Sequence, residues 1–157
     1  SAPQGMSWRV AEMLGLENLE VLQSTNDSGA GFGVVGDLAC AVPSEEYMQR
    51  VMECFGVKAL RHSDIVKSEV ARVAVCTGAG ASLIDVARAS GADLYLTADL
   101  KYNDFMRHEN RIILADMGHF ESEYCAIQIL FDILSKNLCI FAVRKSVCSR
   151  NPVNYMM

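Results

Sequence analysis

The second half of the chain repeats one pattern: a short β-prone run, then a loop, then a helical segment. The predicted elements after Val70 are strands at 71–76, 93–97 and 111–116, and helices at 82–90, 102–108 and 119–136. Strands that alternate with helices of this length pair in parallel, and the helices cover the sheet that the strands form. The pattern therefore predicts an α/β fold, a layered sandwich with a mostly parallel central sheet covered by helices.

The first half of the chain contains the same kinds of element with less regular spacing. A helix is predicted at Ser7–Leu14, ended by Gly15, and a second helix begins at its predicted cap Ser44 and ends at Gly56. Between them, strands are predicted at Leu19–Leu22 and Phe32–Leu38, on either side of a loop at Ser24–Gly31. A final apolar strand is predicted at Leu138–Val143. With 157 residues the chain has the length of one domain, so we expect residues 1–157 to form a single α/β domain.

Charge and composition argue against several classes of function. A net charge of −5 disfavours nucleic acid as a partner, because phosphate binding requires clustered Lys and Arg. No apolar run approaches the roughly 20 residues that a membrane span needs, and the start of the chain lacks the basic and apolar regions of a secretory signal. The six cysteines lack CxxC spacing and lie mostly in apolar segments: Cys40, Cys54, Cys76, Cys125, Cys139 and Cys148. We therefore expect buried free thiols in a cytoplasmic protein.

Each of the three predicted strands after Val70 ends in an unusual loop. The loops are Thr77–Ala81, Ala98–Tyr102 and Met117–His119. If the strands are parallel, all three loops emerge at the carboxyl edge of the sheet, where open α/β sheets bind ligands. The sequence therefore predicts one shared concave site at this edge.

The first loop, in the stretch CTGAGASL, places Gly78 and Gly80 before a helix start at Ser82. Glycine lets a backbone approach a ligand closely, and free amides at a helix start favour an anion. Gly78, Gly80 and Ser82 are therefore a candidate cofactor-binding loop, although it lacks the third glycine of a dinucleotide fingerprint and the Gly-Lys-Ser/Thr of a P-loop. The alternative is a tight strand-to-helix turn with Ser82 as its cap.

The second loop, TADLKYND, carries Asp99 and Lys101 immediately after a strand. Either side chain could contact a substrate or support a metal ligand, with Asp99 orienting a water molecule and Lys101 holding an anionic group. Both are therefore candidate catalytic residues. The alternative is a solvated turn that caps the next helix.

The third loop opens the stretch ADMGHFESEYC, in which His119 and Glu123 are four residues apart. Residues i and i+4 lie one above the other on a helix, so this imidazole and carboxylate form a workable half of a metal site. The predicted core stripe of the same helix is Phe120, Tyr124, Ile127, Phe131 and Leu134. The alternative is structural: a glutamate that favours the first helical turn and a histidine with an ordinary hydrogen bond. Two ligands alone do not hold a metal, and His62 and His108 lie outside these loops.

The ordered motifs VAVCTGAGASL, GADLYLTADLKYNDF and IILADMGHFESE resemble the Nif-three-like family, whose members are also described as GTP cyclohydrolase I type 2 homologs. The segments GLENLEVL, GVVGDL and NPVNY are also similar to that family. The similarity covers nearly all of the chain and is most specific at GHFESE, which matches the family pattern G-H-[YF]-x-[ST]-E. The chain resembles the C-terminal part of such a protein.

The resemblance implies a dinuclear site for divalent metal ions in the intact protein. His119 matches the histidine of the family's GH motif, and Glu123 matches its ligating glutamate. The other ligands of the family come from an N-terminal half that includes a His-His pair, and this sequence has no adjacent histidines. Thr77 and Ala98 stand where the family usually has glycine, and neither change removes a ligand. The residues do not choose among zinc, iron and manganese.

Functions from different classes remain open. The first is a divalent-metal-dependent hydrolase that acts on a nucleotide or another small phosphorylated, anionic substrate; the family description suggests GTP ring opening, but no residue here selects guanine. The second is a non-catalytic metal-binding scaffold or regulatory interaction module. Nucleotide binding through the glycine loop without metal is a third. The resemblance also implies a homo-oligomer, because family members tend to assemble into rings of dimers.

Overall fold

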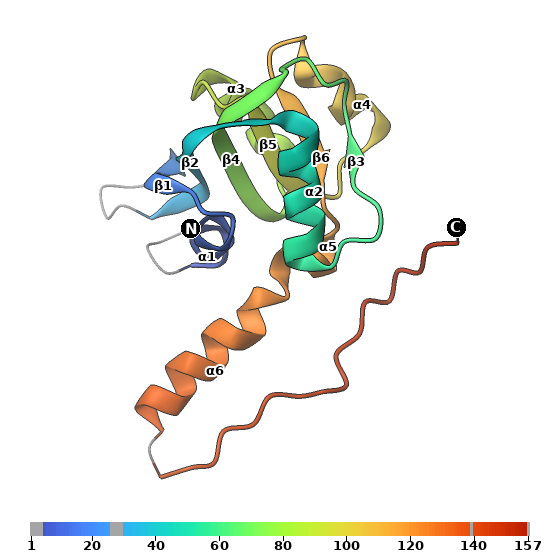
Figure 1. The fold of residues 1–157 in the computed structure, drawn as a ribbon. Helices are drawn as coiled ribbons and strands as arrows, with labels where there is room; N and C mark the ends of the chain where they lie inside the picture. Colours follow the sequence, from blue (N-terminus) through green and yellow to red (C-terminus); the bar gives the residue numbers. More distant parts are fainter. Residues whose placement is uncertain (1–4, 26–29, 139, 157) are drawn as a thin grey trace.

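The computed structural model of the 157-residue chain describes residues 5–25, 30–138 and 140–156. A six-stranded sheet with packed helices forms its body, and a long helix with an extended C-terminal segment projects from this body (Figure 1). The strands are β1 (Glu17–Ser24), β2 (Gly31–Pro43), β3 (Arg61–His62), β4 (Glu69–Ala79), β5 (Leu94–Ala98) and β6 (Ile113–Asp116). The predicted loop Ser24–Gly31 lies partly outside the described residues.

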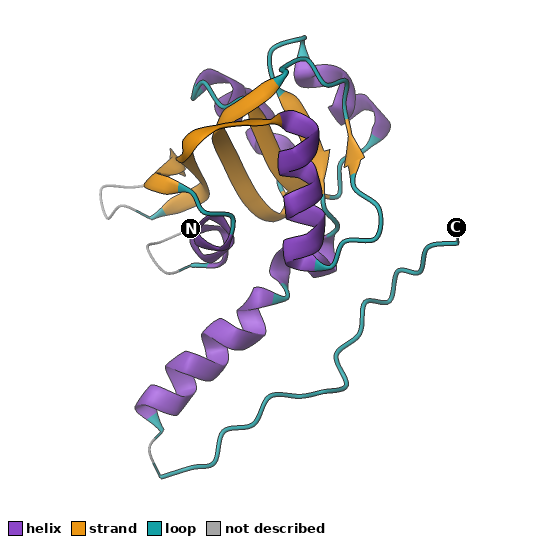
Figure 2. Ribbon diagram, viewed as in Figure 1, coloured by secondary structure: helices purple, strands orange, loops and turns teal. Residues whose placement is uncertain are grey.

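Helical segments occupy most of the connections between the strands (Figure 2). They are α1 (Met6–Met13), α2 (Ser44–Phe55), η1 (Ala81–Leu83), α3 (Ile84–Ala89), α4 (Tyr102–Phe105), η2 (Met106–His108), α5 (His119–Glu123) and α6 (Cys125–Asn137), where η denotes a 3-10 turn. No helix in the described ranges is long and apolar enough to cross a membrane.

The sheet has the strand order β1-β2-β4-β5-β6-β3. The β4–β5 and β5–β6 pairs are parallel, which confirms the prediction for the three strands after Val70. The β1–β2, β2–β4 and β3–β6 pairs are antiparallel, so the prediction of a mostly parallel sheet is wrong. The reason is that the helical connections join neighbouring strands only in β4–β5 and β5–β6, since β2 and β3, which α2 joins, are not neighbours in the sheet. The strands β1 and β2 are joined by a short link that suffices for antiparallel strands.

Side chains on the two faces of the sheet form separate hydrophobic clusters. Alternate residues of β4 face opposite ways: Val73 and Val75 belong to a cluster with Val51 of α2, and Ala74 belongs to a cluster with Ile84 of α3. Burial on both faces explains why β4, β5 and β6 read as nearly continuous apolar runs.

The predicted ends of α2 are correct, but its predicted cap is not. Gly56 ends the helix in a left-handed conformation with φ of 64°. Ser44 is the first helical residue and does not cap it, because its hydroxyl donates to the carbonyl of Lys67 at 2.6 Å. Ser44 thus links α2 to the segment that leads into β4.

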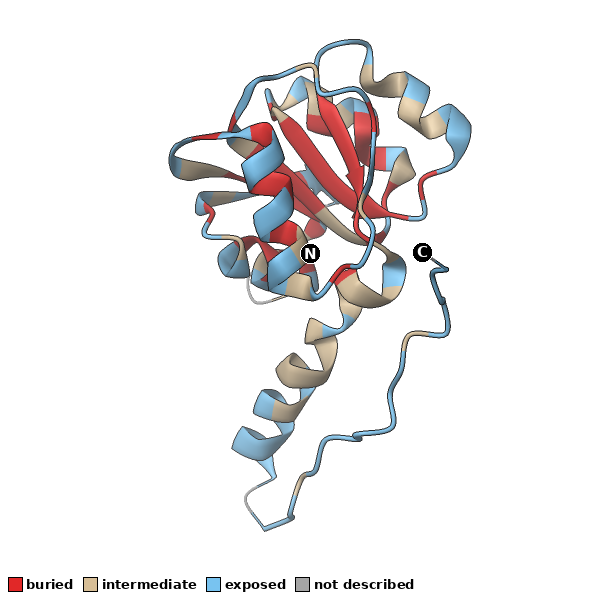
Figure 3. Cartoon of the chain, turned by 45° about the vertical axis from the view of Figure 1, so that its right-hand side comes forward, coloured by how far each residue is buried: buried red, intermediate tan, exposed pale blue. Residues whose placement is uncertain are grey.

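The region after His119 differs most from the prediction. The expected helix at 119–136 is divided at Tyr124 into α5 and α6, and no residue of α6 is buried. Tyr124 and Leu134 of the predicted core stripe are 49% and 42% exposed, so that stripe does not face a core. Figure 3 shows α6 leaving the sheet with exposed and half-buried residues along its length. The described residues of the predicted strand Leu138–Val143 form no strand, because α6 carries them away from the sheet edges.

The cysteines are less buried than predicted. Cys40, Cys54 and Cys148 are exposed, Cys76 and Cys125 are half-buried, and all five are free thiols. Cys139 lies outside the described residues. The prediction of buried thiols is therefore wrong for most of the described cysteines, because an apolar segment at the surface still turns part of its side chains to solvent.

Candidate functional site

The carboxyl ends of the parallel strands meet at one edge of the sheet. Strands β4, β5 and β6 end at Ala79, Ala98 and Asp116. The loops after β5 and β6 bring Asp99 to His119, whose Nδ1 lies 2.7 Å from Oδ2 of Asp99. Asp99 reaches the imidazole from a left-handed backbone conformation with φ of 57°, which aspartate tolerates better than most residues.

His119 and Glu123 are the first and last residues of α5, so one helical turn places their side chains on one face. Nε2 of His119 lies 3.2 Å from Oε2 of Glu123, while Nδ1 faces Asp99. The imidazole therefore lies between two carboxylates. Its side chain is 50% exposed, which leaves this cluster accessible to a ligand.

The two carboxylates favour the charged form of the imidazole. The hydrogen bond to Asp99 is the largest cause that raises the pKa of His119 above its ordinary value, and the negative charge of Glu123 raises it further. Partial burial acts in the opposite direction and does not cancel these effects. When the imidazole is protonated, it therefore pairs with both carboxylates.

Gly78 lets α5 lie close to the sheet. Its φ of 68° favours glycine, and a Cβ at this position would lie 2.5 Å from Oε1 of Glu123 and displace that carboxylate. The Gly78 amide donates to the buried Ser122 hydroxyl at 2.9 Å, and that hydroxyl donates to the His119 carbonyl at 2.8 Å. The Gly78 carbonyl accepts a hydrogen bond from Thr97 at 3.1 Å. Both polar groups of Gly78 are thus used within the protein, and the residue positions the His119–Glu123 pair.

The predicted glycine loop is largely strand, because β4 continues to Ala79. Gly80 is buried and its carbonyl accepts a hydrogen bond from the Tyr95 hydroxyl at 2.8 Å, while Ser82 is exposed in η1. Lys101 is exposed after β5 and does not line the cavity beside His119. The structure brings together Gly78, Asp99, His119 and Glu123, and it leaves Gly80, Ser82 and Lys101 outside this cluster.

A cavity of about 510 Å³ opens beside His119, and its lining includes two charged residues that the sequence did not reveal, Arg61 and Asp116. Asp116 is 4% exposed; its Oδ2 accepts hydrogen bonds from Arg61 and from the Leu100 amide at 2.9 Å, and its Oδ1 accepts one from the Gly118 amide at 3.0 Å. Asp116 therefore fixes the loops after β5 and β6. The only local signal for Asp116 in the sequence is its acidic side chain at the end of an apolar strand. Nothing local points to Arg61, which is 55 residues away from Asp116 in the sequence.

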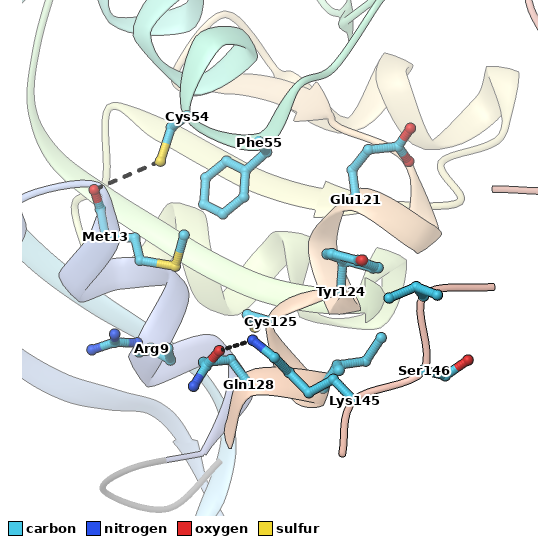
Figure 4. A pocket seen from close by; sticks show the side chains of 12 residues that line it. Arg9, Met13, Cys54, Phe55, Glu121, Tyr124, Cys125, Gln128, Lys145 and Ser146 are labelled. Carbon is cyan, nitrogen blue, oxygen red and sulfur yellow. Dashed lines mark hydrogen bonds between the residues drawn. The ribbon is translucent and has the colours of Figure 1, made fainter. Parts of the chain in front are cut away.

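A larger cavity of about 570 Å³ lies between α1, the end of α2, α6 and the C-terminal segment (Figure 4). At its border Lys145 donates to Gln128 at 2.7 Å, and the Cys54 thiol lies 3.8 Å from the Met13 carbonyl oxygen. Glu121 is the only carboxylate in the described lining, so this cavity lacks a histidine–carboxylate pair. Of these two cavities, the one beside His119 is therefore the one that contains an imidazole next to carboxylates.

The His119–Glu123 pair fits half of a metal site. An imidazole nitrogen and a carboxylate oxygen are ligands that suit zinc, iron and manganese. The hydrogen bond between Nδ1 and Asp99 leaves Nε2, which faces Glu123, as the nitrogen that can present a lone pair to a cation. Within residues 5–25, 30–138 and 140–156, no three or more His, Cys, Asp or Glu side chains are arranged to hold one ion. These ranges therefore supply part of a ligand set.

The sequence is similar to that of several known proteins. Residues 1–152 match the profile of the family described as Duf34/NIF3 (NGG1p interacting factor 3). A "GTP cyclohydrolase 1 type 2 homolog" of Campylobacter jejuni is 38% identical over 106 residues, which are 67% of this chain and 42% of that protein. A protein with the same description from a Nostoc species is 31% identical over 128 residues, which are 80% of this chain and 48% of that protein. The chain thus spans about half the length of these relatives, or less.

Solved structures share the fold. The Staphylococcus aureus hypothetical protein SA1388 superimposes with a TM-score of 0.86 over 98% of this chain and 65% of that chain, at 19% identity. Reduced HcgD from Methanocaldococcus jannaschii gives a TM-score of 0.67 over 85% of this chain and 52% of that chain, at 25% identity. Because the family match extends over nearly the whole sequence, the chain belongs to the Duf34/NIF3 family.

Proposed function

We propose that this chain contributes His119 and Glu123 to a divalent-metal site that further ligands complete. The observation that supports this is the imidazole geometry: Nδ1 is bound by Asp99, and Nε2 lies 3.2 Å from a Glu123 oxygen. Catalytic metal sites usually take about three protein ligands and a water molecule, and two-metal sites take more. A bound divalent metal would supply Lewis acidity and an activated water at neutral pH.

Within this proposal Asp99 is a positioning residue. Its carboxylate fixes the ring orientation and the tautomer of His119, as carboxylates commonly do for metal-ligating histidines. The same hydrogen bond occupies the group that would otherwise orient a water molecule. Lys101 has no contact with the cluster in the described part of the chain, so we assign it no role.

For the activity, we propose hydrolysis of a small phosphorylated compound, such as a nucleotide, by a protein that contains this chain together with the remaining ligands. The descriptions of the relatives as GTP cyclohydrolase 1 type 2 homologs support this class of substrate. The cavity beside His119, of about 510 Å³, is in the range of small-molecule sites.

A second candidate is a metal-binding scaffold without catalytic activity. It is favoured by the incomplete ligand set, because no group of three or more metal-ligating side chains occurs within residues 5–25, 30–138 and 140–156. A longer protein that contains this chain would distinguish the candidates if it carried adjacent histidines, because these would supply the missing ligands.

Paramagnetic broadening by Mn²⁺ tests the metal proposal on this chain. We expect substoichiometric Mn²⁺ to broaden the resonances of His119 and its neighbours first, with weak affinity. His119→Ala and Glu123→Ala should each remove this local broadening without unfolding the protein, because both side chains lie at the surface of the cluster. His62→Ala is the matched control and should leave the broadening unchanged.

Broadening that persists at α5 in both variants would contradict the ligand assignment. Tight stoichiometric binding of metal by this chain would contradict the proposal that it supplies only part of a ligand set.

An assay of GTP hydrolysis by a longer protein with added metal then separates the enzyme from the scaffold. Turnover that is lost in His119→Ala supports the enzyme, and metal binding without turnover supports the scaffold.

A further inference from the structure

Arg61 is held in place at the wall of the His119 cavity. Strand β3 pairs with β6 so that Arg61 lies opposite Asp116. Its Nη2 donates to the buried Asp116 carboxylate and to the Leu100 carbonyl at 3.0 Å, and the guanidinium lies 5.6 Å from the centroid of the Phe105 ring. Three neighbours therefore fix the orientation of the guanidinium before any ligand arrives.

This structural role uses only one nitrogen of the guanidinium. Arginine has five N–H donors, and those on Nε and Nη1 of Arg61 have no hydrogen-bond partner among the described residues. The side chain is 59% exposed although its partner Asp116 is buried. Asp116 also accepts two backbone amide hydrogens, so its charge is stabilised without full use of Arg61. A preorganised, partly free guanidinium is the arrangement that binds oxyanions in two-point contacts.

The other charged groups of the cavity are already bonded. Asp99 binds His119, Asp116 binds Arg61, and Glu121 accepts a hydrogen bond from Asn151 at 2.7 Å. Arg61 is the only lysine or arginine in the described lining. It is linked to the His119–Glu123 pair through Asp116, which also accepts a hydrogen bond from the Gly118 amide next to His119.

We propose that Arg61 is the anion anchor of this cavity, and that it binds a phosphate or carboxylate oxyanion of a small ligand whose reacting part lies at the His119–Glu123 pair. The inference rests on the proposed function, because it names the ligand class of the same cavity. It transfers to Arg61 the anion-binding role that the sequence had suggested for Lys101 and the glycine loop.

An NMR titration of metal-free, ¹⁵N-labelled chain tests this directly. Pyrophosphate and citrate are the two probes, added at constant ionic strength because charge interactions are screened by salt. We expect at least one of them to shift, saturably, both the Nε–Hε resonance of Arg61 and the backbone amide resonance of Gly118, which lines the same cavity and remains as the readout in the Arg61 variants. Arg61→Lys should weaken that binding roughly tenfold, since lysine keeps the charge and loses the planar fork. Arg61→Gln should abolish it.

Lys145→Gln is the matched control, because Lys145 is a cation in the other cavity (Figure 4). It should leave the affinity unchanged. If Arg61→Gln does not fold, because it leaves the buried Asp116 without its cation, Arg61→Lys decides the test. The proposal is overturned if neither anion gives a saturable shift, if the folded Arg61 variants bind as tightly as the parent, or if Lys145→Gln loses as much affinity. Metal is absent throughout, so these results do not depend on whether His119 and Glu123 bind Mn²⁺.

Discussion

Strand β5 and helix α6 are both rich in apolar residues, yet all five residues of β5 are buried and none of α6 is. Strand β5 lies between β4 and β6, and the sheet carries a hydrophobic cluster on each face. Helix α6 projects from the body and exposes Leu130, Ile133 and Leu134 (Figure 1). The difference shows that an apolar segment is buried only where the chain itself supplies the surface that covers it.

Replacing one leucine in each region should give the largest contrast. Leu96 in β5 is 0% exposed, and Leu134 in α6 is 42% exposed. We expect Leu96→Ala to lower the free energy of unfolding by about 2–5 kcal/mol, through lost burial and the cavity left behind. Leu134→Ala should change it by less than about 0.5 kcal/mol. Urea denaturation of both variants measures the difference.

A large loss of stability in Leu134→Ala would break the comparison. It would mean that α6 is covered in solution, for example by a second copy of the chain. Sedimentation of the parent protein at two concentrations would then identify self-association as the cause.

Ser122 lies where the two regions meet, and its replacement should have an intermediate effect. It is the only buried residue of α5, and its hydroxyl accepts the hydrogen bond of the Gly78 amide. We expect Ser122→Ala to cost about 1–3 kcal/mol of unfolding free energy, because a buried amide loses its partner. Ser82→Ala is the control: Ser82 is exposed, so its loss should be close to zero. Equal stability of the two variants would show that β4 and α5 are not joined in this way.

Local sequence patterns predicted the features that depend on residues close to one another in the chain. The parallel strands followed from the alternation of strands and helices, and the carboxyl edge followed from their direction. The placing of His119 beside Glu123 followed from helical spacing. Asp99 was found because it comes immediately after a buried strand, although its hydrogen bond to His119 was not foreseen.

Contacts between distant segments explain what the sequence did not show. Arg61 and Asp116 are 55 residues apart and meet only because β3 joins the edge of the sheet beside β6. The strand β4 continues past Cys76 because Gly78 is bound by Ser122, 44 residues later. The exposure of α6 depends on the absence of a covering surface in the described part, which no helical periodicity reveals.

The smallest expected effect concerns His119. Its side chain is half-exposed, and therefore less buried than the residues of β5. Asp99 and Glu123 raise the pKa of its imidazole in the folded chain. The unfolded value is about 6.5. A raised folded pKa means that the stabilisation is fully present below the unfolded value and is lost as the pH rises through the folded value.

Asp99→Asn should therefore lower the pKa of His119, because the hydrogen bond to the charged carboxylate is the largest cause of the shift. The stability difference between this variant and the parent should be greatest below the unfolded value of about 6.5, where the stabilisation by protonated His119 is fully present. It should vanish at pH values above the folded pKa of His119. NMR titration of the imidazole protons in metal-free protein measures the pKa, and urea denaturation across this pH range measures the stability.

Asp132→Asn on exposed α6 is the matched control, since the Asp132 carboxylate accepts a hydrogen bond from Gln128 and not from His119. An unchanged His119 titration in Asp99→Asn would show that the 2.7 Å contact does not persist in solution, and with it the positioning role of Asp99 would fall.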